Sequence, residues 1–279
     1  MPKPPADTRL SATIMLLRDG PERLEVFMVQ RHHQIDFATG ALVFPGGKTD
    51  EADAAPELLA FCNGPEDRPS RETTVRIAAI RETFEECGVL LARPRGGDAL
   101  VDAARLESIA ARYRDPLQSG ERTMLDLVHE EDLELAFDLL VPFAHWITPE
   151  FMPKRFDTYF FLVPAPPDQL AVHDGSESVD SLWTTIPDAL DLEQRGERTI
   201  IFPTLENMKK LGRSPTVEAA IDAARQAPIV TVLPRIEKEA DGSLTMVLPE
   251  DAGYDTVRAP MEALGGASPA ARATATEPK

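Results

Sequence analysis

Three carboxylates and one arginine share a short segment of this chain, Arg81-Glu82-Thr83-Phe84-Glu85-Glu86-Cys87-Gly88-Val89. In a helix that turns about 100° per residue, Glu82, Glu85 and Glu86 fall within roughly a third of the circumference. The opposite side collects the apolar residues Ile77, Ile80, Phe84 and Cys87. Mg²⁺ binds carboxylate oxygens and usually shares substrate phosphates. The pattern therefore indicates either a metal-dependent phosphate-ester site or a solvated acidic helix face, in which three like charges would repel.

A glycine turn upstream favours the metal site. Phe44-Pro45-Gly46-Gly47 follows the apolar run Ala41-Leu42-Val43, so a backbone that can approach a ligand closely precedes the acidic helix. Asp53 comes six residues after Gly47 and adds a further carboxylate.

Together these segments resemble the signature of the Nudix hydrolases: Gly, five residues, Glu, seven residues, then Arg-Glu-apolar-any-Glu-Glu-any-Gly-apolar. The second half is matched at Arg81, Glu82, Glu85, Glu86, Gly88 and Val89, with Thr83 at the apolar position. Asp53 replaces the first glutamate, and 27 residues instead of seven separate it from Arg81. A longer loop costs only logarithmically more entropy. An enlarged box is also a feature of the coenzyme A diphosphatases and their bacterial relatives, and the resemblance spans roughly residues 9–190.

The resemblance implies an α/β Nudix fold, in which a mixed β-sheet is sandwiched between α-helices, here with inserted helices. It implies hydrolysis, with Mg²⁺ or Mn²⁺, of the diphosphate linkage in a nucleoside diphosphate joined to another group. Coenzyme A or acyl-coenzyme A is the leading substrate. In that branch an upstream motif fits Arg31 and Gly40, but Asp36 stands where a second arginine is usual. ADP-ribose, dinucleotides, nucleotide sugars, an RNA cap and a ligand-binding domain without turnover remain alternatives.

Roles for individual residues also follow from the resemblance. Glu82, Glu85 and Glu86 bind the metal, and the Gly47 carbonyl completes the inner shell. Arg81 orients the glutamates by salt bridges, for which its spacing to Glu85 is suitable, and Asp53 braces the turn. Glu177 is the candidate general base, with Asp174, Asp180 and the box itself as rivals. Arg31 is a candidate for gripping phosphate, and Arg155 for contacting a nucleotide.

Composition limits the partners. The net charge is −18, which disfavours duplex nucleic acid and leaves a small phosphorylated substrate. Two cysteines are too few for a disulfide scaffold and favour a cytoplasmic protein. Neither a run of 18 apolar residues nor an N-terminal signal core is present, so we expect no membrane partner. A homodimer stays open, because dimers are common among similar proteins and no residue here demonstrates one.

The chain divides into a flexible segment 1–8, one Nudix hydrolase domain 9–250 and a disordered tail 260–279. Within the domain we expect a box insertion 54–70, a helical insertion 98–140 and a C-terminal extension 200–250 packed on the core. Apolar segments predict strands at 10–17, 24–30, 141–147, 158–163, 181–185, 229–233 and 244–247. Helical periodicity and caps predict helices at 70–87, 102–114, 122–140, 187–194, 203–211 and 216–225.

Overall fold

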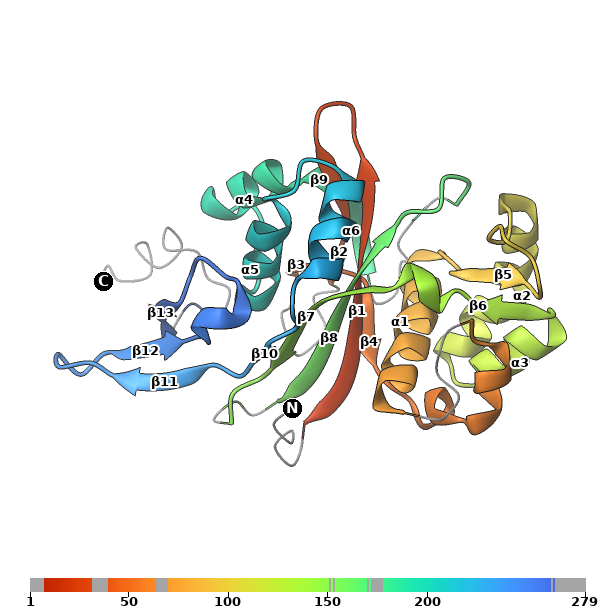
Figure 1. Ribbon diagram of the computed structural model, residues 1–279, viewed down its shortest axis with the longest axis horizontal. Coiled ribbons are helices and arrows are strands. Elements are labelled where there is room, and N and C mark those ends of the chain that lie inside the picture. Colours follow the sequence, from red (N-terminus) through yellow and green to blue (C-terminus); the bar gives the residue numbers. More distant parts are fainter. Residues whose placement is uncertain are drawn as a thin grey trace.

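A mixed eight-stranded sheet forms the centre of the protein (Figure 1). The computed structural model describes residues 8–31, 40–63, 70–150, 152, 154–169, 171, 178–261 and 263. The strand order is β10-β7-β8-β1-β2-β3, with β4 paired to β1 and β9 paired to β2. The β1–β8 and β10–β7 pairs are parallel and the other pairs are antiparallel. The strands are β1 Arg9–Asp19, β2 Leu24–Arg31, β3 Leu42–Val43, β4 Gly46–Lys48, β7 Val141–Ile147, β8 Phe156–Pro164, β9 Ser178–Thr185 and β10 Thr231–Val232.

Helices cover both faces of this sheet, which confirms the predicted α/β sandwich. Alternate side chains of β1 enter two separate apolar clusters, because successive residues of a strand point to opposite faces. Ile14 and Leu16 pack on the side of α1, Arg71–Cys87. Met15 and Leu17 pack on the side of α5, Phe202–Leu211, and α6, Val217–Gln226. Helix α4, Ile186–Gln194, contacts β9 and α5.

Helix α1 begins and ends where the sequence predicts. Ser70 is the N-cap, and its Oγ accepts a hydrogen bond from the Thr73 amide at 3.0 Å. Gly88 ends the helix in the left-handed conformation, with φ 69°, and its amide donates to the Phe84 carbonyl at 2.9 Å. Both ends of the acidic helix are therefore fixed by local chemistry.

The helical insertion differs from its prediction. It contains α2, Ala103–Gln118, and a short α3, Met124–Glu130, but the helix predicted over 122–140 is wrong beyond Glu130. The chain reverses at Asp132, whose φ is 49°, and continues as strand β6, Leu133–Leu135, paired with β5, Ala92–Pro94. Leu133 and Leu135 are buried and flank a half-buried Glu134, so a period of two decides this segment.

The two insertions contact each other. A 3₁₀ turn, Glu51–Ala54, leads into the box insertion, and a second 3₁₀ turn, Pro56–Phe61, lies within it. Leu58 is fully buried in the same cluster as the inserted helices, and the Asn63 amide donates to the Leu135 carbonyl at 3.1 Å. The surface excursion predicted for this insertion is therefore partly a packing element. Residues 64–69 lie outside the described residues.

The C-terminal extension carries a three-stranded antiparallel sheet of β11 Arg235–Lys238, β12 Leu244–Val247 and β13 Arg258–Pro260. It therefore continues past residue 250, and in Figure 1 this sheet lies on the side of α5. The flexible N terminus and most of the disordered tail were predicted for residues outside the described part. Among the described residues, none of the helices has the length and apolar character needed to cross a membrane.

Candidate active site

Arg81 lies at the centre of a buried acidic group between α1, β4 and the 3₁₀ turn Glu51–Ala54. Its side chain is 8% exposed. Nε and one terminal nitrogen donate to the two carboxylate oxygens of Asp53, each at 3.0 Å, and the same terminal nitrogen donates to the Lys48 carbonyl at 2.8 Å. Burial disfavours its charge, yet the hydrogen bond to Asp53 and the charges of Glu82 and Asp53 raise the pKa of Arg81 above its ordinary value. Arg81 therefore stays a cation.

The other terminal nitrogen of Arg81 joins two of the three glutamates. It donates to Glu82 Oε1 at 3.0 Å and to Glu85 Oε2 at 3.1 Å, so the predicted ion pair from Arg81 to Glu85 is present. Glu86 is held differently, because its Oε2 accepts the amide of Gly46 at 2.9 Å. Glu86 thus meets the glycine turn and the other two glutamates meet Arg81, so the acidic side of α1 is not the solvated face that the alternative interpretation required.

The glycine pair allows α1 to approach β4. A Cβ on Gly47 would lie 2.4 Å from Cδ of Glu82, in the space that the carboxylate occupies. A Cβ on Gly46, whose φ is 151°, would lie 2.3 Å from the backbone oxygen of Ala12. The absence of a side chain at Gly46 therefore allows β4 to pack against β1, and its absence at Gly47 leaves room for the carboxylate of Glu82.

These two glycines predict a contrast between matched variants. Gly46→Ala forces a backbone clash and a disfavoured φ, so we expect it to lower the free energy of unfolding by about 3 kcal/mol or more. Gly47→Ala meets only the end of a flexible side chain. It should leave the unfolding temperature nearly unchanged and weaken Mg²⁺ binding about tenfold by displacing Glu82. Thermal unfolding and calorimetric titration measure the two effects, and equal destabilisation by both variants would contradict this division.

The donor set fits a hard divalent cation. Within the described stretches, no three acidic, histidine or cysteine side chains already enclose one point as metal ligands. However, Glu82 and Glu86 place carboxylate oxygens against the Gly46-Gly47 turn, and Glu85 lies on the same arginine as Glu82. Carboxylate oxygens are the ligands that Mg²⁺ and Mn²⁺ take. Burial raises the pKa of Glu85 to about 7 even though the charge of Arg81 lowers it. Burial therefore makes the negative charge of Glu85 costly, and Arg81 offsets only part of this cost.

A stability measurement tests the cost of burying the charge of Glu85. Because the pKa of Glu85 is raised in the folded protein, its charged form costs stability above pH 7, and the cost disappears as pH falls toward the ordinary value of 4.5. We expect Glu85→Gln to stabilise the metal-free protein by about 1 to 2 kcal/mol at pH 8. The gain should shrink as pH falls from 7 to 5. Thermal unfolding in EDTA measures the difference in stability between the variant and wild type. A variant less stable than wild type at pH 8 would contradict the prediction.

The remaining predicted site residues have different outcomes. Arg155 lies at the start of β8, where its Nε donates to the Thr148 carbonyl at 3.1 Å, so this contact holds a strand connection. Asp180, a rival for the general base, pairs with Arg198 at 3.1 Å. The side chain of Arg31 is not among the described residues, and neither is Glu177 nor Asp174.

Arg114 on α2 contacts the acidic helix in a way that the sequence does not predict. Its Nε donates to the carbonyl of Glu85 at 2.9 Å and its terminal nitrogen to the carbonyl of Glu86 at 3.0 Å. No sequence signal could have revealed this contact, since a backbone carbonyl is present at every residue and the partners lie 28 and 29 positions apart.

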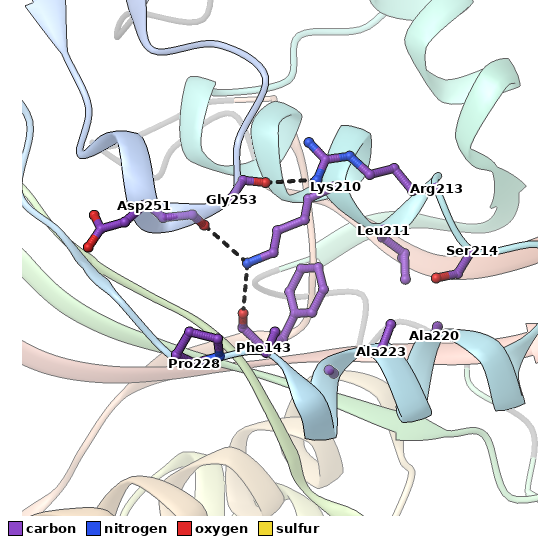
Figure 2. A pocket seen from close by; sticks show the side chains of 13 residues that line it. Phe143, Lys210, Leu211, Arg213, Ser214, Ala220, Ala223, Pro228, Asp251 and Gly253 are labelled. Carbon is purple, nitrogen blue, oxygen red and sulfur yellow. Dashed lines mark hydrogen bonds between the residues drawn. The ribbon is translucent and has the colours of Figure 1, made fainter.

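A hollow of about 250 Å³ lies between α5, α6 and residues 251–253 (Figure 2). Lys210 projects into it, and its Nζ donates to the carbonyls of Phe143 and Ala252 at 3.4 and 3.3 Å. Burial lowers the pKa of Lys210. Arg213 donates to the Gly253 carbonyl at 2.8 Å. Lys210 thus joins the C-terminal extension to β7 of the core, and both cations hold residues 252–253 of the extension, so we interpret the hollow as a structural joint.

Comparison with known proteins establishes the family. A sequence model of the NUDT19 Nudix domain matches residues 63–211, which is more than half of the chain. The chain belongs to the Nudix hydrolase family. The matched region of this Nudix domain includes α1 and both inserted helices, so the acidic group on α1 lies within it.

Individual relatives indicate the same family as the sequence model. This Nudix domain is 29% identical over 208 residues to the human acyl-coenzyme A diphosphatase NUDT19, an alignment covering 61% of the chain and 56% of the human protein. The Xenopus laevis protein of the same name is 26% identical over 208 residues, which cover 60% of the chain and 54% of that protein. The chain thus spans about half the length of these relatives. The predicted family and its coenzyme A diphosphatase branch are confirmed.

A solved structure supports the fold. The crystal structure of a Nudix hydrolase from Alicyclobacillus acidocaldarius is 29% identical to this Nudix domain and superimposes with a TM-score of 0.62. The superposition covers 77% of the chain and 96% of the bacterial protein, so the sandwich described above is the fold of a Nudix hydrolase.

Proposed function

We propose that this protein hydrolyses the diphosphate linkage of a nucleoside diphosphate joined to another group, with coenzyme A or acyl-coenzyme A as the substrate. One observation carries the proposal: Glu82 and Glu86 lie against the Gly46-Gly47 turn, while Glu85 shares the buried Arg81 with Glu82. The relatives named acyl-coenzyme A diphosphatases support the choice of substrate.

Glu82, Glu85, Glu86 and the Gly47 carbonyl would hold Mg²⁺ or Mn²⁺. When bound, such a cation neutralises phosphate oxygens and lowers the pKa of a coordinated water. Arg81 keeps Glu82 and Glu85 in place through the contacts described above, and preorganised ligands of this kind cost no rearrangement during the reaction. The Gly46 amide does the same for Glu86.

The reaction adds a water oxygen to phosphorus and breaks the bond from phosphorus to the bridging oxygen, while a base takes the proton. We propose Glu177 as that base, since it precedes β9 in a segment that also contains Asp174. Arg31 is proposed to contact a phosphate, and Arg155 the nucleotide. The net charge of −18 supports a small phosphorylated substrate in preference to duplex nucleic acid. The cytoplasmic compartment and a homodimer stay predictions.

The sequence around Asp36 favours a second candidate. An anion at the position of a usual arginine could remove a contact to the 3′-phosphate of coenzyme A, a group that ADP-ribose, dinucleotides and nucleotide sugars lack. These compounds are therefore the alternative substrates. A non-catalytic binding domain is disfavoured because pure binding does not require the full set of Arg81 and three glutamates.

Purified protein with Mg²⁺ or Mn²⁺ should be incubated in ¹⁸O water with coenzyme A, an acyl-coenzyme A, ADP-ribose, a diadenosine polyphosphate and a nucleotide sugar. Mass spectrometry should show cleavage of coenzyme A or its thioester, with ¹⁸O in one of the two products. Cleavage of ADP-ribose without coenzyme A would overturn the substrate alone. No cleavage of any compound would overturn the hydrolase activity on this class of substrates.

A further inference from the structure

The last turn of α1 contains two of the proposed metal ligands, Glu85 and Glu86, and its backbone carbonyls need hydrogen-bond donors from outside the helix. The last four carbonyls of an α-helix have no partner within the helix. In α1, which ends at Cys87, these include the carbonyls of Glu85 and Glu86. Arg114 supplies a donor to each, at 2.9 and 3.0 Å. One guanidinium therefore fixes two consecutive peptide groups, both belonging to proposed ligands.

Arg114 reaches α1 from a rigid support. Helix α2 buries one apolar side in the same core cluster as α1, through Leu106, Ile109, Tyr113 and Leu117. Next to Arg114, the Tyr113 hydroxyl donates to Glu130 of α3 at 2.5 Å. Gly88 leaves room for the approach, since a Cβ there would lie 3.3 Å from a terminal nitrogen of Arg114. The inserted helices thus hold the guanidinium in place against the end of α1.

We propose that Arg114 is a positioning residue for the metal site, and that the helical insertion serves to hold the last turn of α1, which contains Glu85 and Glu86. The inference rests on the proposed function. Helical side chains tilt toward the N terminus, whereas carbonyls point toward the C terminus. Arg114 therefore grips the carbonyl end of these two residues and its charge stays on the far side from their carboxylates. By fixing two peptide planes, it fixes the direction in which both carboxylates leave the helix.

The chain offers a matched control. Arg105 also lies on α2 and also donates to a backbone carbonyl, that of Glu131, at 2.5 Å. Its acceptor belongs to the insertion and not to α1. Arg105→Met therefore removes the same kind of contact without touching the proposed ligands, so any effect that both variants share reports structural damage alone.

The test measures Mn²⁺ affinity of the full chain by calorimetry without substrate, and the unfolding temperature in EDTA. We expect Arg114→Met to weaken Mn²⁺ binding about 10- to 100-fold, the range found for residues that orient metal ligands. Arg114→Lys should fall between this variant and wild type, because an ammonium replaces the fork by a single donor point. Arg105→Met should bind Mn²⁺ as wild type does, even if its unfolding temperature falls.

Wild-type affinity in Arg114→Met would overturn the proposal, and so would an equal loss in Arg105→Met. If Arg114→Met does not fold, Arg114→Lys decides in the same way, and wild-type affinity there overturns the role. A wild-type protein that binds no Mn²⁺ would instead overturn the proposed function, together with the positioning role. The two failures are therefore distinguishable.

Discussion

Glu86→Gln is expected to reduce metal-dependent turnover roughly 10³-fold, within the range for groups placed at a reacting centre. The exchange removes one negative charge from the ligand set with almost no change of shape. The side-chain oxygen of the glutamine can still accept the hydrogen bond that the Gly46 backbone amide donates to Glu86 at 2.9 Å. The unfolding temperature should therefore stay within about 2 °C of wild type. Steady-state kinetics with Mg²⁺ and thermal unfolding measure both quantities.

Glu107→Gln is the matched control for this exchange. Glu107 lies exposed on α2, so the same chemical change there should leave both turnover and stability unaffected. Turnover that survives in Glu86→Gln, or that persists in wild type after chelation, would contradict a metal role for the glutamates.

Arg81→Met is expected to lower the free energy of unfolding by about 3 to 5 kcal/mol, the usual cost of breaking a buried ion pair by removing one partner. Asp53 and Glu85 are 1% and 6% exposed, and both would lose their cation. The Lys48 carbonyl would lose its donor as well. Urea denaturation in EDTA measures the loss, and the variant should also lose metal-dependent turnover.

An exposed arginine provides the comparison for this variant. Arg95 pairs with Asp132 at 3.2 Å, with side chains 43% and 78% exposed. Arg95→Met should cost less than about 1 kcal/mol, as exposed ion pairs usually do. A loss for Arg81→Met that is no larger than the loss for Arg95→Met would show that the acidic group does not depend on Arg81.

Features set by short-range patterns were predictable from the sequence. The Ser70 cap, the Gly88 stop and the Arg81–Glu85 pair each depend on residues no more than four positions apart in a helix. The strand Val141–Ile147 follows from a buried apolar run, and its observed bounds match the predicted ones. For the same reason the acidic segment is recognisable from the order of its residues alone.

Features set by distant contacts were not predictable. The periodicity of α1 indicates an acidic side, but not that Glu85 and Glu86 are each only 6% exposed. Their burial depends on β4, a strand of three residues of which two are glycines, and such a strand has no apolar alternation to reveal it. Asp53 and Arg81 are 28 positions apart, and only the folded chain shows their bidentate pair.

The two insertions pack around α1 and support the residues that hold the acidic group. Asp53, immediately before the box insertion, holds Arg81 from one side, and the helical insertion supplies Arg114, which holds the end of α1. Both insertions share the apolar cluster beneath α1. Their packing therefore bears directly on the proposed ligands, which a free surface loop would not do.

Diffraction from a crystal soaked in Mn²⁺ shows whether the glutamates bind the metal, because anomalous scattering locates the ion without reference to activity. We expect an anomalous peak within coordination distance of carboxylate oxygens of Glu82, Glu85 and Glu86, beside the carbonyl of Gly47. A soaked crystal without a peak at the glycine turn, in which these side chains keep their contacts to Arg81 and the Gly46 amide, would contradict this expectation.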